Sequence, residues 1–255
     1  MFYKEIHEMK LRVIIMFIVL LVSLVTTVAL RPYAAQMMEE MTAQLEEMPD
    51  FLKSLMGDVS GLTRLNDDNY YLLSQWHGKN YGQFLPFVVL LIAFPIFAKE
   101  FDKKTIYFLL SRKNRNEVFR TKYLAGLGAV LIITTVLSLL GPIAMNLAGY
   151  STAFGDTLKV LLQQLVGASF FYSLFTMISM SRDQVKPVVA GILIVLGLPI
   201  LGMIDALSWL NPYPFILGSS VAQKGTIDWI YLVSLLAATV VLTVIDYKVF
   251  EKKEV

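Results

Sequence analysis

The chain has 255 residues, of which 56% are hydrophobic and 16% are charged, and its formal net charge is +2. A soluble domain usually carries about 25% charged residues, so the deficit predicts a protein embedded in lipid. The small net charge argues against a nucleic-acid-binding protein. The absence of cysteine excludes disulfides and thiolate chemistry, and the presence of only two histidines, His7 and His77, argues against a histidine-built metal or catalytic site inside the membrane.

Apolar stretches that could cross a membrane recur along the whole chain. A lipid-spanning helix needs roughly 17–25 mostly apolar residues, and six stretches reach or approach that length. They are Val13–Leu30, Tyr81–Ala98, Tyr123–Leu147, Val160–Met180, Val188–Ile204 and Trp229–Ile245. Pro86, Pro95 and Pro199 interrupt the second and fifth stretches, where we expect kinks. The sequence therefore predicts an all-α fold, a polytopic bundle of six transmembrane helices that forms one domain over residues 1–255.

Lysine and arginine are distributed unevenly between the two sets of connecting segments. Sixteen of the 22 lie in segment 1–12, in segment 99–122, in the turn after the fourth span and in the C-terminal tail. Because loops rich in Lys and Arg stay in the cytoplasm, we expect a multi-pass protein of the cell membrane with both termini cytoplasmic. Trp76, Trp209 and Trp229 fall at the predicted outer boundary, where aromatic rings prefer to lie.

The predicted extracellular segment 31–80 is long, acidic and rich in methionine. Its apolar residues recur at three- and four-residue steps, which predicts amphipathic helices, with Pro49 opening a second one. Methionine packs adaptably, so Met37, Met41 and Met48 could offer a plastic surface to an amphipathic cargo. The alternative is that they pack on the bundle or on a partner subunit.

Segment 99–122 joins a short amphipathic stretch to a basic run. Phe101, Thr105, Phe108 and Leu109 follow one another at i, i+4, i+7 and i+8, which predicts a short amphipathic helix Phe101–Leu110 on the cytoplasmic side. Three interpretations stay open: the basic run only anchors the chain by its positive charge, the helix floats on the leaflet surface, or the helix is a docking element for a soluble partner.

The residue order in this segment resembles the signature loop of ABC-2-type permeases, the membrane subunits of type V ABC exporters. The matching positions are Glu100, Thr105, Leu109, Leu110, Ser111, Arg115 and Lys122. The likeness continues along nearly the whole chain, from an amphipathic N-terminal segment to the proline-rich stretch Asn211–Pro214. The chain departs from the family at Lys104, where Gly is frequent, and at Arg112 and Lys113, where Pro often follows the serine. The short form is similar to permeases that export peptide toxins or confer bacteriocin immunity in Gram-positive bacteria.

The resemblance implies that the short helix is a coupling helix, which rests in a groove of an ABC ATPase subunit. The ATPase-coupling residues would then be Glu100, Phe101, Thr105, Phe108, Leu109 and Arg115. Glu100 is either an exposed carboxylate among lysines or a coupling residue paired with a basic group of the ATPase or of the N-terminal helix. The chain contains no P-loop motif, so we expect no catalytic residue and no bound cofactor or metal in it, with ATP and Mg on the partner ATPase.

The resemblance also implies an assembly of two ATPase subunits with two permeases, the second being identical or homologous, in which the first, second and fifth spans line a shared cavity. The expected activity is outward transport of a hydrophobic or amphipathic substrate by alternating access, with peptide favoured and lipid or drug possible. Gln163, Gln164 and Asn146 would either line the substrate path or form hydrogen bonds between helices.

Two other functional classes stay open at this point. A non-transporting membrane sensor or immunity protein would need no ATPase, and its segment 99–122 would tolerate substitution freely. An intramembrane protease is disfavoured because the pairs Glu39–Glu40 and Glu46–Glu47 fall in the polar outer segment and no histidine falls within a predicted span.

Overall fold

The structure, a computed structural model, describes residues 2–47, 64–180 and 185–253. Its regular elements in these ranges are all helical, which confirms the predicted all-α class. Five helices there are long and apolar enough to cross a membrane, namely Phe2–Ala29, Asp68–Asp102, Arg115–Leu147, Phe154–Ser179 and Trp229–Lys252, and Val185–Leu201 is a shorter apolar helix. Each of the six predicted spans falls largely on one of these helices, so the chain is a polytopic helical bundle.

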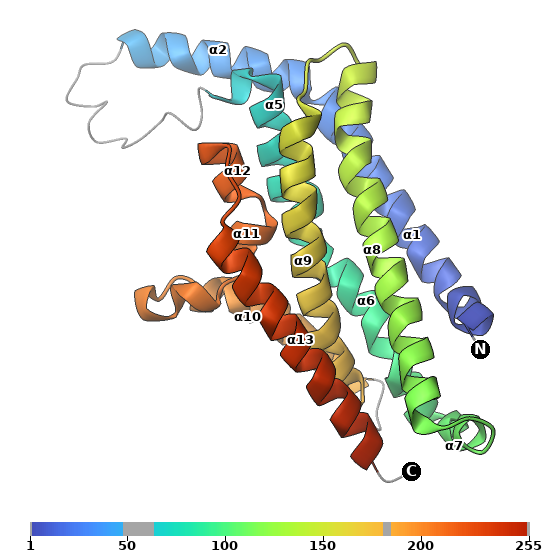
Figure 1. Cartoon of the computed structure of the whole chain (residues 1–255). Helices are drawn as coiled ribbons and strands as arrows, with labels where there is room; N and C mark the ends of the chain where they lie inside the picture. Colours follow the sequence, from blue (N-terminus) through green and yellow to red (C-terminus); the bar gives the residue numbers. More distant parts are fainter. Residues whose placement is uncertain (1, 48–63, 181–184, 254–255) are drawn as a thin grey trace.

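The elements follow one another in a simple order. The first half contains α1 (Phe2–Ala29), α2 (Arg31–Glu47), the 3-10 turn η1 (Arg64–Asn66), α5 (Asp68–Tyr71), the π-helical η2 (Leu72–Asn80), α6 (Tyr81–Asp102) and α7 (Thr105–Leu110). The second half contains α8 (Arg115–Leu147), α9 (Phe154–Ser179), α10 (Val185–Leu201), the 3-10 turn η3 (Asp205–Leu210), α11 (Tyr213–Ile216), α12 (Ser219–Lys224) and α13 (Trp229–Lys252). Figure 1 shows α7 and both termini in one half of the bundle and α2 at the opposite end.

The core forms around α9, which packs against α6, α8 and α13. Phe171, Tyr172 and Phe175 on α9 are fully or almost fully buried there. In contrast, α1 and α13 keep long rows of apolar side chains exposed, for example Val22 and Val25 on α1 and Val233 and Val240 on α13. An apolar outer surface of this kind is stable only where lipid replaces water around it.

The helix that contains the second predicted span is longer than the predicted stretch Tyr81–Ala98. Despite Pro86 and Pro95, α6 is continuous, and it extends η2 and α5, so that the helix runs from Asp68 to Asp102. His77, which we expected outside any span, is fully buried in the π-helical part of this long helix. Hydropathy missed this extension because residues 72–80 are too polar to read as a membrane segment.

The proline-rich stretch after α10 turns back against the bundle. Pro212 begins α11, whose Ile216 lies against Gly167 of α9, where any side chain larger than hydrogen would collide with it. The hydroxyl of Tyr213 donates to the Val195 carbonyl of α10 at 2.9 Å. These contacts join the segment between α10 and α13 to both α9 and α10.

The predicted amphipathic helix of the outer segment is α2. The turn from α1 into α2 is held by Arg31, whose guanidinium donates to the Asp68 carboxylate at 2.9 Å and lies over the Tyr71 ring. Met38 is buried, whereas Met37 is 64% exposed. The structure does not describe the side chain of Met41. Met48 and the second helix predicted at Pro49 also lie outside the described residues.

Candidate functional site

The short helix predicted in segment 99–122 is α7, and it lies at the end of the bundle. A turn at Lys103 and Lys104 separates it from α6, and Lys104 adopts a left-handed backbone with φ 57°. Left-handed residues favour glycine because a Cβ atom is strained there. Glycine would therefore fit better than lysine at position 104. After α7, the side chain of Asn114 accepts from the backbone N–H of Glu117 at 2.8 Å and begins α8.

The predicted apolar stripe does not exist as one face of one helix. Phe101 belongs to α6, and the left-handed turn at Lys104 resets the helical phase before Thr105, so the spacing of four residues no longer places them on one side. Within α7 the inward side chain is Ile106, which is fully buried. Tyr107 and Phe108 point outward and are 53% and 57% exposed, and the Arg112 guanidinium lies 4.2 Å from the centre of the Phe108 ring. Leu109 is partly buried against the core.

A buried ion cluster lies directly behind α7. Glu100 at the end of α6 is only 3% exposed, and it accepts hydrogen bonds from the Lys122 ammonium of α8 at 3.0 Å and from the Thr105 hydroxyl of α7. Lys122 is 1% exposed and also donates to Glu5 of α1 at 2.8 Å. Glu5, Glu100 and Lys122, which we call the buried triad, thus join α1, α6 and α8, and Thr105 adds α7 to the same network.

A second, more exposed layer of charges extends the triad along α1. The Lys4 ammonium lies 3.4 Å from Glu100 and 3.5 Å from Glu8, and Lys99 forms an ion pair with Glu8. Glu100 therefore pairs with Lys4 of the N-terminal helix, which is one of the two basic partners that we considered, and it also pairs with Lys122. Its burial contradicts the alternative of an exposed carboxylate among lysines.

Two further predicted coupling residues, Phe101 and Arg115, contact the C-terminal helix α13 of the same chain. Phe101 is buried against Phe250, and the Lys253 ammonium lies 4.1 Å from the centre of the Phe101 ring. Arg115 donates to the carbonyls of Phe250, Glu251 and Lys253 at 3.2, 3.0 and 2.7 Å. These carbonyls have no partner within α13 because they end a helix, so Arg115 caps it and complements its dipole.

The predicted substrate-path residues are buried or engaged within this chain. Gln163 is fully buried and donates to Ser220 of α12 at 3.1 Å. Gln164 is also fully buried on α9. Asn146, near the end of α8, accepts from the N–H and the hydroxyl of Thr152 at 3.1 and 3.0 Å. Gln163 thus makes a hydrogen bond between helices, as the alternative predicted, whereas Asn146 binds the loop that follows its own helix. A role of these residues in the substrate path stays a prediction.

Glu5 and Asp246 are buried charged residues that sequence reasoning did not select, and Lys122 was matched to the signature loop but was not among the predicted coupling residues. Lys122 ends a basic run and directly precedes the apolar stretch Tyr123–Leu147, and this position at the start of a span was the signal that its side chain could be buried. Asp246 is fully buried on α13 although we ended that span at Ile245, and neither carboxylate oxygen has a hydrogen-bond partner in the described structure. Within the same ranges, no group of three or more His, Asp or Glu side chains could hold a metal ion.

Comparison with known proteins adds one finding. The family model described as "ABC-2 family transporter protein" matches residues 3–255. No curated protein and no solved structure matches the chain.

Proposed function

The chain belongs to the ABC-2 family of transporter proteins, and from this premise we propose that it is the permease of an ATP-driven exporter whose ABC ATPase docks on α7. Membership makes the chain a multi-pass membrane permease of an ABC transporter, and it implies partnership with an ABC ATPase. The observation that carries the docking proposal is the exposed aromatic pair Tyr107 and Phe108 on a short helix anchored from behind.

The aromatic pair suits a protein partner. Large aromatic side chains provide most of the binding energy in many interfaces, because they bury a large area at a small cost in conformational entropy. Arg112 over the Phe108 ring adds a cation of the type enriched at such contacts. The basic residues around α7 favour the cytoplasmic side, where an ATPase could reach them.

The buried triad supports a role for α7 in transmitting motion. A helix that is pushed can move its neighbours only if it is rigidly joined to them. Thr105 binds Glu100, Glu100 binds Lys122, and Lys122 binds Glu5, so a displacement of α7 would reach α6, α8 and α1 through groups that are costly to separate. Movement of α1 and α6 would in turn alter a cavity shared with a second permease, identical or homologous, in an assembly with two ATPases.

We favour a hydrophobic or amphipathic peptide as the exported substrate, with lipid or drug as the other candidates. A cleft of about 560 Å³ between α2 and the η1–η2 region is lined by Met37, Met38 and Tyr33, among others. Flexible thioether side chains in such a cleft can adapt to varied apolar surfaces. Absence of ATP-dependent peptide uptake into inverted vesicles, in which the cytoplasmic face points outward, would remove the peptide from this proposal without affecting the docking of the ATPase.

Purification from the native membrane tests the docking proposal. The tagged chain is isolated in mild detergent, and its companions are identified by mass spectrometry. We expect a P-loop ATPase in near-equal amount, which the change of Tyr107 and Phe108 to Asp removes. The matched control is Tyr33→Asp, which alters an exposed aromatic side chain at the opposite end of the bundle. Recovery of the chain alone, whatever the variant, would favour the stand-alone sensor or immunity protein.

A further inference from the structure

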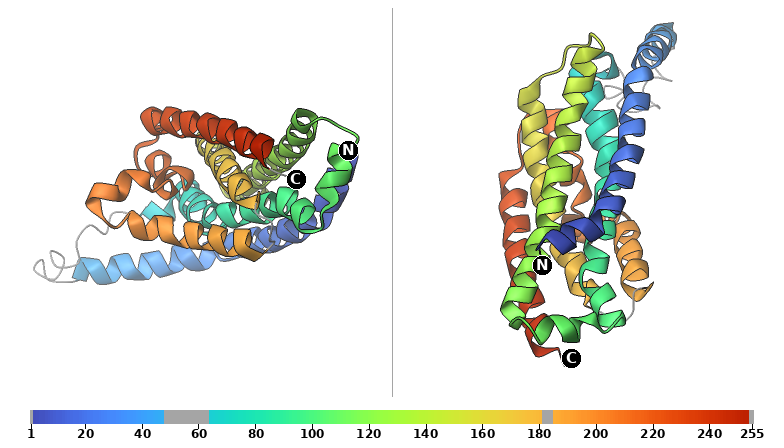
Figure 2. Two further views of the ribbon diagram at one scale, coloured as in Figure 1. Left: turned by 90° about the horizontal axis from the view of Figure 1, so that it is seen from below. Right: turned by 90° about the vertical axis from the view of Figure 1, so that its right-hand side faces the viewer.

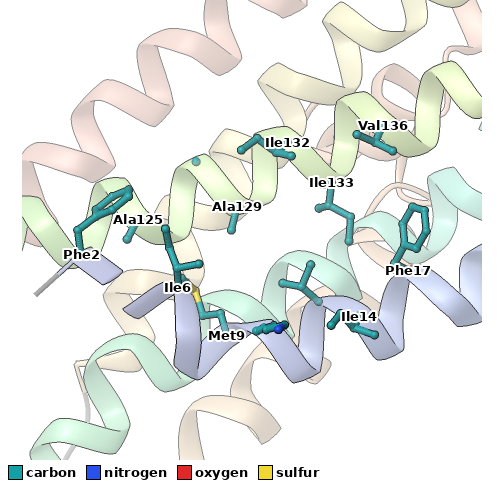
Figure 3. A pocket seen from close by; sticks show the side chains of 13 residues that line it. Phe2, Ile6, Met9, Ile14, Phe17, Ala125, Ala129, Ile132, Ile133 and Val136 are labelled. Carbon is teal, nitrogen blue, oxygen red and sulfur yellow. The ribbon is translucent and has the colours of Figure 1, made fainter. Parts of the chain in front are cut away.

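An apolar groove of about 490 Å³ runs between the first half of α1 and the middle of α8. Its volume lies within the range of about 300–1,000 Å³ that is typical of small-molecule sites. Figure 3 shows Ile6 and Phe17 of α1 facing Ala129 and Ile133 of α8 across it. The groove is wide here because α8 presents the small residues Ala125, Gly128 and Ala129 to it, and a Cβ atom at Gly128 would meet nothing within 4 Å.

One lysine interrupts the otherwise apolar lining. Lys10 lies on the same face of α1 as Ile6, Val13 and Phe17, and it lines the groove with them. Across the described ranges, Lys10 forms no ion pair, because the carboxylates of its own helix are bound elsewhere: Glu5 to Lys122, and Glu8 to Lys4 and Lys99. Among the residues that the structure describes, the groove therefore has one cation with no counter-charge.

The position of this cation matches the depth of a lipid headgroup. Lys10 precedes Val13, where the first predicted span begins, whereas Phe17 of α1 and Val136 of α8 lie deeper along the same groove. The first turns of α1 run across the bundle at an angle to the rest of the helix, as they would along a membrane surface (Figure 2). Lysine side chains at this level extend their ammonium toward phosphate while the methylene stem covers apolar surface.

We propose that the groove binds one anionic phospholipid of the leaflet on the α7 side, with an acyl chain between α1 and α8 and the headgroup phosphate on Lys10. The inference requires only that the chain spans a membrane and does not depend on the ATPase or the transported substrate. A second copy of the chain fits less well, because a symmetric contact would place one concave surface against another and would leave both Lys10 side chains without an anion.

Photolabelling in lipid vesicles tests this site. The full chain is reconstituted in phosphatidylcholine with a trace of phosphatidylglycerol that carries a diazirine on its acyl chain, and the labelled peptides are mapped by mass spectrometry. We expect adducts in residues 2–17 and 125–136, about fivefold more abundant than with the matching phosphatidylcholine probe, since one basic residue at the surface favours anionic lipid by about that factor.

Two variants with matched controls separate the parts of the proposal. Gly128→Phe fills the groove without a backbone clash and is expected to abolish this labelling, whereas Gly155→Phe, at a helical glycine that also has open space, leaves it unchanged. Lys10→Gln is expected to reduce the phosphatidylglycerol adducts to the phosphatidylcholine level, and Lys252→Gln on α13 is not. Equal labelling by both probes that survives Gly128→Phe would overturn the proposal, as would cross-links between two copies of the chain across the groove.

Discussion

Replacing Lys122 by methionine is the most informative test of the buried triad. Methionine keeps an unbranched side chain of similar length but leaves Glu5 and Glu100 as two buried carboxylates without their shared cation. Removing one partner of a buried ion pair costs about 3–5 kcal/mol, and the upper part of that range applies where one lysine serves two carboxylates. For a chain of this size each kcal/mol corresponds to roughly 2–4 °C, so a loss of about 4–5 kcal/mol should lower the unfolding temperature by roughly 8–20 °C.

Thermal unfolding of the purified chain in detergent measures this effect. The control is Lys113→Met, which removes an exposed ion pair with Glu117 and should lower the unfolding temperature by no more than about 2 °C. Combining Lys122→Met with Glu5→Gln and Glu100→Gln removes the stranded charges and should recover much of the loss, a non-additivity expected of groups in contact. A Lys122→Met shift no larger than that of Lys113→Met would refute the triad as the link between α1, α6 and α8.

Three further substitutions follow from single contacts. Lys104→Gly should stabilise the protein by about 1–2 kcal/mol because it removes left-handed strain from the turn between α6 and α7. Lys103→Gly should destabilise it, because Lys103 has a right-handed backbone in which glycine has no advantage. Thermal unfolding distinguishes the two variants, and an equal effect of both would contradict this prediction. Asp246→Asn should raise the unfolding temperature because the buried carboxylate has no hydrogen-bond partner in the described structure. Asp228→Asn, at the start of the same helix, should change the unfolding temperature little, since asparagine also caps a helix. A lower unfolding temperature of Asp246→Asn would contradict the absence of a partner. Arg115→Met should speed amide hydrogen exchange in the last turn of α13 but not in its first turn, and unchanged protection would exclude the capping role.

The fold class was accessible from the sequence because lipid imposes a strong rule. Every backbone polar group in the bilayer must find a partner within the protein, so each long apolar stretch had to be a helix. The same rule explains why the sequence did not predict the helical extension over residues 68–80. These residues pack largely against other helices of the protein rather than against lipid, so the extension does not need apolar side chains throughout. Several of their polar side chains bind other helices of the bundle, as Asn80 donates to Thr27 of α1 at 2.8 Å, and polar residues of this kind give no hydropathy signal.

The candidate site was only partly accessible for a different reason. The residue pattern located α7 and selected Glu100. Periodicity, however, assumes an unbroken helix, and a lysine in the sequence does not indicate the left-handed backbone that Lys104 adopts. Ion pairs between distant segments were equally hidden. Glu5 and Lys122 are 117 positions apart, and nothing in either local sequence indicates that they meet. The pattern could therefore indicate a docking helix but not which of its side chains face outward.

Site-directed cross-linking tests the central claim, that an ATPase binds the outer face of α7. The chain contains no cysteine, so Phe108→Cys introduces a single reactive thiol, and Tyr33→Cys provides the control at the opposite end. A thiol-to-amine cross-linker is applied to native membranes, and the adducts are identified by mass spectrometry. The account predicts an adduct with a P-loop ATPase from position 108 and none from position 33. Free, readily labelled thiol at position 108 without any ATPase adduct would contradict it.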